Sequence, residues 1–339
     1  LKLYRVTGEK KYLDLAKCVI DPRGNAEGHN TTEGKYAGKY QQDHVPLPLQ
    51  KEAVGHAVRA GYFYAAATDV AALTGESAYD EALHNIWNNI VHQKIYLTGG
   101  IGAEPRHEGF GPNYELPNAT AYTETCAAIA LMLWNQRMFL KSGEVKYMDL
   151  FERTLYNGFL SGVSFEGNTF FYPNPLEADG FTKFNQGVCG RSPWFDCSCC
   201  PVNVVRILPS LPGYIYATKE NKVFVNLYMS NRAEIALGNQ TLHLSQTTKY
   251  PWDGKIEMEV LNTPTVAAVF NLRVPGWVRN EVMDGDHYRY FDEHKPSVSL
   301  KVNGTNVTPL IESGYITLEK HIWQKNDKIT IAFEMPVRK

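Results

Sequence analysis

Several features that decide the class of a protein are missing from this 339-residue sequence. No apolar run approaches the roughly 20 residues needed to cross a bilayer, so no membrane partner is expected. Lys and Arg total 34 and Asp and Glu total 36, so there is no excess charge of one sign to attract nucleic acid. This balance of charge suits a neutral polar ligand. A hydrophobic fraction of 44% predicts a globular protein with a large core and two domains.

The first residues also lack an initiator Met and a signal-peptide pattern. We therefore expect the chain to begin inside a longer protein, whose targeting signals are not part of this sequence. The cysteines are then the remaining guide to the compartment, and retained thiols favour a cytoplasmic location. The sequence leaves the oligomeric state open, a homodimer included.

A short motif recurs three times in the first half of the chain. Thr7-Gly8-Glu9, Thr74-Gly75-Glu76 and Ser142-Gly143-Glu144 are spaced by 67 and 68 residues, and a tyrosine follows each glutamate by three positions. A left-handed glycine ends a helix, and glutamate favours the positive N-terminus of the next one. Each repeat is therefore predicted to be a helical hairpin, and stacked hairpins form α/α solenoids or toroids with a concave inner face.

The sequence pattern changes after Leu208, where short alternating or β-branched runs are separated by turn residues. The clearest predicted strands are 214–217, 222–228, 241–244, 266–274 and 328–333. Asp253-Gly254 and Asn303-Gly304 are predicted tight turns. The expected fold is therefore mainly α with β, with a helical domain in residues 1–212 and an antiparallel β-sandwich in residues 213–339.

Four of the six cysteines form an unusual pattern. Cys126 stands alone, whereas Cys197, Cys199 and Cys200 fall within four residues of sequence. This spacing is typical neither of a disulfide framework nor of paired Cys-x-x-Cys zinc knuckles. Clustered thiolates plus one distant thiolate instead indicate a soft-metal site, for which zinc is the default ion.

Pro201 follows Cys200 directly, and apolar residues then continue with helical spacing. Because proline favours the first helical turn, Cys199 and Cys200 are predicted at a helix N-terminus, where the helix dipole and a metal ion both stabilise a thiolate. The residues alone leave three interpretations open: a catalytic zinc site, a structural zinc site and a redox-active cysteine pair. Cys18 and Cys189 are expected to be packing or surface residues.

Candidate acid/base groups lie in the glycine-rich segment 98–111. Its glycines lack the Gly-x-x-x-x-Gly-Lys-Ser/Thr order of a phosphate loop, but loops of this kind commonly carry site residues on a rigid frame. Glu104 and Glu108 both qualify, and either also suits a solvated surface loop. Glu124 and Cys126 lie at a predicted helix start, where a carboxylate is favoured in any case.

Four separated motifs resemble one known family in order and spacing. They are Gly99-Gly100-Ile101-Gly102 with Glu108, Tyr122-Thr123-Glu124-Thr125-Cys126-Ala127, Phe171-Tyr172-Pro173-Asn174-Pro175-Leu176, and Cys199-Cys200-Pro201-x-Asn203-x-x-Arg206. Through these motifs the sequence resembles the bacterial β-L-arabinofuranosidases of glycoside hydrolase family 127. The resemblance implies a six-hairpin α/α toroid, of which this chain holds the last three hairpins, followed by β-sandwich domains.

The resemblance also implies roles for individual residues. The implied ligands of one Zn²⁺ are Glu124, Cys126, Cys199 and Cys200. Cys199 would in addition be the nucleophile, Glu108 the general acid/base, and His56 and Tyr172 would contact the sugar or the nucleophile. No role is implied for Cys197.

The implied reaction is a double displacement that releases β-L-arabinofuranose from an oligosaccharide or glycan, with a thiolate in place of the usual second carboxylate. The alternatives are the same chemistry on a different sugar, a non-catalytic zinc-stabilised carbohydrate-binding scaffold, and a thiol oxidoreductase. Because half of the implied toroid is absent, inner helix faces would be exposed. Residues 1–339 alone are therefore expected to be poorly soluble or inactive.

Overall fold

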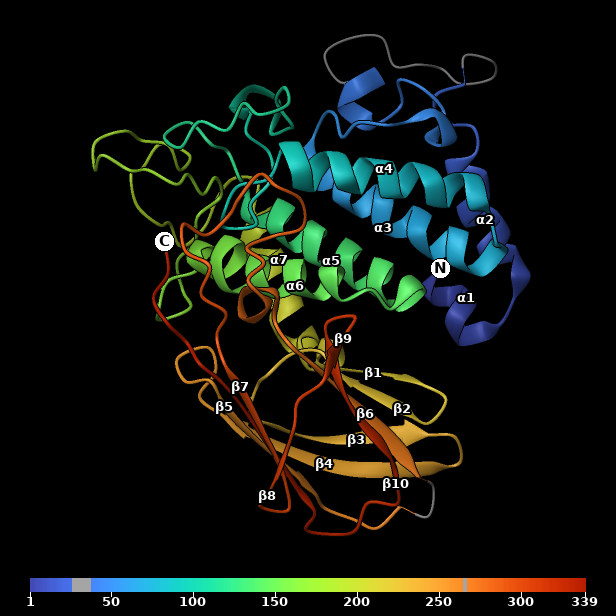
Figure 1. Cartoon of the computed structure of the whole chain (residues 1–339). Helices are drawn as coiled ribbons and strands as arrows, with labels where there is room; N and C mark the ends of the chain where they lie inside the picture. The colour runs from blue at the N-terminus through green and yellow to red at the C-terminus, as the bar shows by residue number, and fades with distance from the viewer. Residues whose placement is uncertain (26–37, 265–266) are drawn as a thin grey trace. The chain divides into compact units, whose positions relative to one another are not determined.

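The computed structural model describes residues 1–25, 38–264 and 267–339, and the chain divides into two compact units (Figure 1). Unit 1 comprises Leu1–Gly143, Leu150–Ile207 and Gly285–His287, and it carries most of the helices. Unit 2 comprises Glu144–Asp149, Leu208–Asp284 and Tyr288–Lys339, and it carries the strands. The predicted order, a helical region followed by antiparallel sheets, is confirmed. No helix in the described ranges combines the length and the apolar character that a membrane span requires.

The three sequence repeats are helical hairpins, as predicted. Their helices are α1 (Lys2–Thr7) and α2 (Lys10–Ile20), α3 (Ala57–Thr74) and α4 (Ser77–Gln93), and α5 (Thr125–Ser142) and α6 (Val145–Arg153). Gly8, Gly75 and Gly143 separate the two helices of each hairpin, with φ of 72°, 75° and 77°. Each glycine N–H donates to the carbonyl four residues earlier. A left-handed glycine therefore ends one helix and redirects the chain into the next.

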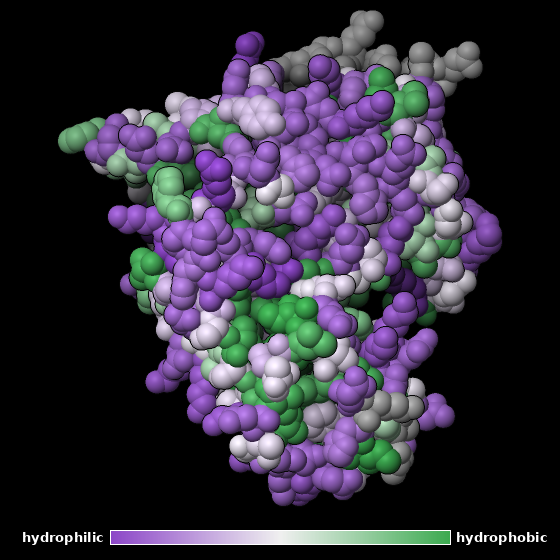
Figure 2. Space-filling view, viewed as in Figure 1, coloured by the Kyte–Doolittle hydropathy of each residue, from purple (hydrophilic) through white to green (hydrophobic). Residues whose placement is uncertain are grey.

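The two long helices α3 and α5 form the centre of unit 1. They pack closely because small residues line their contact: a Cβ added at Gly61 would lie 2.7 Å from the Cβ of Ala130. On the other side of α3, α4 buries an apolar stripe that includes Ile86, Trp87 and Ile90. Its outward surface is largely hydrophilic (Figure 2). Helix α5 also packs against α7 (Cys199–Ile207), and this contact positions the site described below.

A π-helical segment, Thr154–Phe159, follows α6 and supports the glycine-rich loop. A Cβ added at Gly99, whose φ is +81°, would lie 2.5 Å from Thr154 Oγ1. The loop is thus held by close backbone contacts that a larger residue would block. The 3₁₀ turns of the structure are Gly38–Gln41, Leu47–Leu49, Pro105–His107, Leu160–Gly162, Leu208–Ser210 and Gly276–Arg279.

Unit 2 contains two sheets, with strand orders β1-β2-β6-β10-β9 and β3-β4-β5-β11-β7-β8. The strands are β1 (Tyr216–Lys219), β2 (Lys222–Val225), β3 (Asn231–Leu237), β4 (Gln240–Thr248), β5 (Lys255–Val260), β6 (Ala268–Arg273), β7 (Val298–Val302), β8 (Thr305–Val307), β9 (Ile311–Glu312), β10 (Tyr315–His321) and β11 (Lys328–Phe333). Neighbouring strands run antiparallel except β2 and β6, which pair in parallel. On the visible face of unit 2, hydrophobic residues gather over the strands (Figure 2).

Some strand bounds differ from the prediction. Residues 214–215 belong to the short helix α8 (Pro212–Ile215), because Pro212 presets the first helical turn. The apolar run 222–228 forms a strand only as far as Val225. The predicted strand 266–274 corresponds to β6, and Val266 lies outside the described residues.

The two predicted turns have different structures. Asn303 and Gly304 have φ of 50° and 80° and join Val302 to its partner Thr305, which makes a two-residue hairpin turn as predicted. Gly254 instead lies in the longer connection between β4 and β5. A Cβ there would lie 2.0 Å from the Phe333 carbonyl oxygen, so this glycine permits a close backbone approach.

Candidate active site

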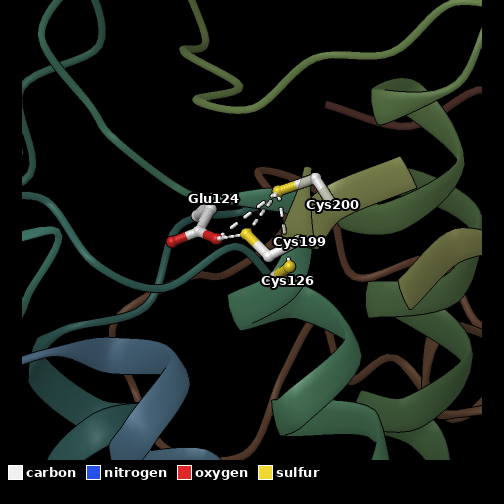
Figure 3. Close-up of side chains that lie close together, drawn as sticks. All are labelled: Glu124, Cys126, Cys199 and Cys200. Atoms are coloured by element: carbon white, nitrogen blue, oxygen red, sulfur yellow. Dashed lines mark hydrogen bonds between the residues drawn. The ribbon is translucent and has the colours of Figure 1, made fainter. Parts of the chain in front are cut away.

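The side chains of one glutamate and three cysteines converge at the N-terminal ends of α5 and α7 (Figure 3). Glu124 is the N-cap of α5, and Cys126 is the second residue of that helix. Cys199 and Cys200 are the first two residues of α7, with Pro201 in the first turn, as predicted. The packing of α7 against α5 therefore brings together residues more than 70 positions apart in the sequence.

The cluster is compact. Cys126 Sγ lies 3.3 Å from Cys200 Sγ, and Cys199 Sγ lies 3.8 Å from Cys200 Sγ. Both Cys199 Sγ and Cys200 Sγ are 3.4 Å from Glu124 Oε1. Cys126 and Cys200 are fully buried, whereas Cys199 is partly exposed. Among the three sulfurs, Cys199 is therefore the one that a small molecule can reach.

Burial of the cluster makes it unfavourable for all of its acidic groups to be ionised at the same time. Burial raises the pKa of the Glu124 carboxyl well above its usual value, and the charge of Cys199 raises it further. Burial likewise raises the pKa of Cys200. Hydrogen bonds from Cys126 and Cys200, with a further one from Tyr172, lower the pKa of Cys199. Without a cation the thiolate is therefore favoured on Cys199, and a bound cation would let the other groups ionise too.

The donor set fits a metal ion. One donor atom from each of the four side chains lies within 4.8 Å of all the others. Glu124 Oε2 is buried and has no hydrogen-bond partner within the described part of the chain. A buried carboxylate oxygen without a proton donor is costly, and a bound cation removes that cost. The Glu/Cys cluster could therefore hold an ion.

Glu108 lies beside this cluster and is held by two side chains. Its Oε2 is 3.2 Å from His56 Nε2, and its Oε1 accepts a hydrogen bond of 3.0 Å from the Tyr122 hydroxyl. The hydrogen bond from His56 lowers the pKa of Glu108, partly offset by burial. His56, Glu108 and Glu124 also each offer an atom within 4.8 Å of the other two. The carboxyl of Glu108 therefore faces the same region as the cluster.

The structure separates the two loop glutamates that the sequence left equivalent. Glu104 Oε1 accepts a hydrogen bond of 2.8 Å from the Arg106 backbone N–H and caps the turn Pro105–His107. Glu108 ends that turn in the left-handed region, at φ 52°. Its own carbonyl accepts from the Ala57 N–H at the start of α3. Glu104 therefore caps the loop turn, whereas Glu108 is the carboxyl that lies beside the cluster.

Tyr172 is buried at the edge of the cluster. Its hydroxyl is 3.9 Å from Cys197 Sγ, and the tyrosine also helps to lower the pKa of Cys199. The Tyr172 carbonyl accepts from the Thr125 N–H at 3.1 Å, which ties the tyrosine to the start of α5. Cys197 is exposed and lies outside the group of four donors.

Sequence reasoning assigned no role to three residues that shape this site. Tyr122 holds Glu108, Asn203 contacts Cys126 Sγ at 2.9 Å, and Asn185 Oδ1 accepts from the Tyr172 N–H at 2.8 Å. Tyr122 and Asn203 lie inside the motifs quoted above, so those motifs could have pointed to them. Asn185 is a single polar residue in a loop, and no sequence signal distinguishes it.

Comparison with known proteins assigns both parts of the chain to domains of one family. Residues 1–213 match the family described as the β-L-arabinofuranosidase GH127 catalytic domain, and residues 222–335 match the GH127 middle domain. The chain is 33% identical over 356 residues to the non-reducing end β-L-arabinofuranosidase of Bifidobacterium longum subsp. longum, covering 98% of this chain and 51% of that protein.

Two solved structures are also similar. A GH127 β-arabinofuranosidase matches with a TM-score of 0.91 and 49% identity. The match covers 99% of this chain and 50% of that protein. A GH127 β-L-arabinofuranosidase from Geobacillus stearothermophilus T6 matches with a TM-score of 0.86 and 36% identity. The match covers 99% of this chain and 53% of that protein. The chain thus spans about half the length of these relatives.

Proposed function

Since this chain belongs to the GH127 β-L-arabinofuranosidase family, we propose that the protein containing it is a retaining glycosidase that releases β-L-arabinofuranose from a glycan. The observation that carries the proposal is the position of the partly exposed Cys199 thiol. It lies beside three further possible metal ligands, and Glu108 faces the same region. In this proposal residues 1–212 belong to the catalytic domain, and residues 213–339 form a supporting β-sandwich.

The proposed metal ion is Zn²⁺, with Glu124, Cys126, Cys199 and Cys200 as ligands. These side chains would hold the ion, because one donor atom of each lies within 4.8 Å of the others and zinc accepts cysteine and glutamate ligands. When bound, the ion supplies the positive charge that keeps the cysteine sulfurs ionised at neutral pH. The chemistry that follows is carried out by the protein's own side chains.

In the first step, the Cys199 thiolate attacks the anomeric carbon while Glu108 donates its proton to the departing glycosidic oxygen. A carbon–sulfur bond forms as the carbon–oxygen bond breaks, which leaves the sugar attached to Cys199. Cys126 and Cys200 are too buried to take this role. His56 and Tyr122 contact one Glu108 oxygen each, so they hold the carboxyl in one orientation.

In the second step, the Glu108 carboxylate takes a proton from water as the water oxygen attacks the same carbon. The carbon–sulfur bond breaks, the electron pair returns to Cys199, and arabinose leaves with its original anomeric configuration. We assign His56 and Tyr172 to contacts with the sugar or with Cys199. Tyr172 suits this role because it is buried at the edge of the cluster and helps to lower the pKa of Cys199.

The proposal is tested with Cys199→Ser and Glu108→Gln in the full-length protein. Each variant should lose hydrolytic activity. Removal of the metal by a chelator should also abolish activity, and added Zn²⁺ should restore it. Cys197→Ser is the matched control, because Cys197 is exposed and outside the donor group. A fully active Cys199→Ser protein would overturn the assignment of the nucleophile.

Two further measurements separate the alternatives. A covalent inhibitor with arabinofuranose configuration should add its mass to the peptide that contains Cys199. Release assays on a panel of furanosides and pyranosides then identify the sugar. Equilibrium sugar binding with no hydrolysis by the full-length protein would instead support a zinc-stabilised carbohydrate-binding scaffold.

A further inference from the structure

A hydrogen-bonded group of three residues ends on the sulfur of Cys126. Asn203 Nδ2 donates to Cys126 Sγ at 2.9 Å. On the other side of the amide, Asn203 Oδ1 accepts from the Tyr62 hydroxyl at 3.2 Å and from an Arg206 guanidinium nitrogen at 2.6 Å. We call Tyr62, Asn203 and Arg206 the Asn203 relay. Tyr62 lies on α3, whereas Asn203 and Arg206 are one turn apart on α7.

The orientation of the Asn203 amide follows from these contacts. Arg206 can only donate hydrogen bonds, so the amide atom facing it is the oxygen. The amide nitrogen must then face Cys126, and the sulfur of Cys126 is the acceptor. The positive charge of Arg206 polarises the amide and strengthens its N–H donor. The relay therefore supplies one directed hydrogen bond to the Cys126 sulfur.

The relay distinguishes Cys126 from the sulfur that reacts. Cys126 is fully buried, so water cannot solvate its charge, whereas Cys199 is partly exposed. Three thiolates and one carboxylate around a divalent ion leave a net charge of −2, and buried negative charge needs hydrogen-bond donors. Outer-shell donors of this kind fix the geometry of metal ligands and tune their strength.

We propose that the Asn203 relay is a positioning device: its hydrogen bond holds the Cys126 sulfur in the orientation needed to bind the metal, and Cys199 is the sulfur left to bond with the sugar. Asn203 and Arg206 touch neither the sugar carbon nor the attacking sulfur in this scheme. They act through Cys126. The inference rests on the metal site of the proposed function, and it adds residues outside the four ligands to that site.

The test uses the full-length protein and the variant Asn203→Asp, which keeps the side-chain size, removes the N–H donor and adds a negative charge. Its dissociation constant for Zn²⁺, measured by competition with a chelator, should rise by about 10–100-fold. In the Co²⁺-substituted protein the sulfur-to-metal charge-transfer band should shift. The value of kcat should fall while KM changes little, because the relay does not contact the sugar.

Arg206 provides the graded comparison. Arg206→Met removes the charged donor to Asn203 and should weaken Zn²⁺ binding, whereas Arg206→Lys retains a cationic donor and should recover most of it. Val205→Ala is the matched control on the same helix, because Val205 is 67% exposed. It should leave the Zn²⁺ dissociation constant and the charge-transfer band unchanged.

The outcomes distinguish a failure of the relay from a failure of the proposed function. If the unmodified protein binds no metal, the proposed function fails and the relay fails with it. If the unmodified protein binds Zn²⁺ and Asn203→Asp binds it equally well with an unshifted Co²⁺ band, the relay is wrong and the proposed function stands. Should Asn203→Asp fail to fold, equal Zn²⁺ affinities for Arg206→Met and Arg206→Lys would overturn the inference.

Discussion

At the scale of single residues, the chemistry of the site depends on how each acidic group is surrounded. The carboxyl of Glu124 is buried with one oxygen unpaired, and its pKa is raised. The carboxyl of Glu108 has both oxygens engaged, and its pKa is lowered, chiefly by His56. These opposite environments agree with the different tasks that we propose for the two carboxyl groups, metal binding and proton transfer.

The pairing of His56 with Glu108 predicts a change in pH dependence. In the proposed mechanism Glu108 must carry a proton to act as the acid, so activity should fall as pH rises through its pKa. Because His56 lowers that pKa, His56→Ala should raise it and move the alkaline limb of the kcat/KM profile to higher pH. The measurement is the pH profile of both proteins on one substrate.

A graded variant serves as the control for this prediction. His56→Gln keeps a hydrogen-bond donor but cannot become charged, so its alkaline limb should lie between those of the other two proteins. An alkaline limb that stays in place, or moves to lower pH, in His56→Ala would show that another group sets it.

At the scale of elements, the glycine-rich loop is held firmly against the π-helical segment Thr154–Phe159. The sequence predicted that the loop carries site residues, but its composition suggested only flexibility. The close contact between Gly99 and Thr154 joins positions more than 50 residues apart in the sequence. Sequence reasoning could not foresee that contact, because it depends on how α6 and the following π-helical segment pack.

This contact predicts that two glycines with similar φ, 81° at Gly99 and 77° at Gly143, respond differently to alanine. Gly143 has nothing within 4 Å of its Cβ position, so Gly143→Ala should cost only the left-handed strain of about 1–2 kcal/mol in unfolding free energy. Gly99→Ala adds a clash with Thr154 and should cost about 1–3 kcal/mol more. Denaturant unfolding of both variants measures the difference.

Activity gives a second measurement on the same pair. Because Gly99 lies in the loop that presents Glu108, Gly99→Ala should also lower kcat, whereas Gly143→Ala should not. Equal losses of stability in the two variants would mean that the loop moves freely enough to avoid Thr154.

At the scale of the whole molecule, unit 2 contains a buried ion pair. Arg273 is fully buried, and one of its nitrogens lies 2.6 Å from Asp149 Oδ1. Arg279 donates to the other oxygen of the same carboxylate. The carboxylate of Asp149 thus balances two guanidinium groups, and its removal would leave the buried charge of Arg273 uncompensated.

Asp149→Asn should therefore lower the unfolding free energy by about 3–5 kcal/mol. The exposed pair Lys255–Glu257 offers the matched control, because both side chains are more than half exposed. Glu257→Gln should cost no more than about 1 kcal/mol. Thermal or denaturant unfolding of the two variants provides the comparison, and similar small losses would contradict a structural role for the Asp149 network.

Apolar side chains on α1 and α2 give a second prediction at this scale. Leu3, Val6, Leu15 and Val19 are 58%, 85%, 61% and 60% exposed. Exposed apolar surface on neighbouring helices promotes association, so residues 1–339 produced alone should associate and show little activity. Light scattering should detect the association, and the double variant Val6→Lys with Leu15→Lys should reduce it. A monodisperse, fully active chain 1–339 would contradict this.

The sequence by itself determined those features that depend on neighbours along the chain. Gly8, Gly75 and Gly143 ended helices because only glycine adopts the left-handed conformation without strain. Pro201 placed Cys199 and Cys200 at a helix start because proline suits the first turn. The alternating runs after Leu208 likewise predicted strands, although α8 interrupted the first of them.

Only the tertiary structure decided which of similar residues suits which task. It distinguished Glu108 from Glu104 through the contact with His56, and it left Cys199 partly exposed while burying Cys126 and Cys200. It also brought Asn203 to the Cys126 sulfur. The physical reason is that burial and hydrogen bonding between distant segments depend on how helices pack, and no short stretch of sequence contains that information.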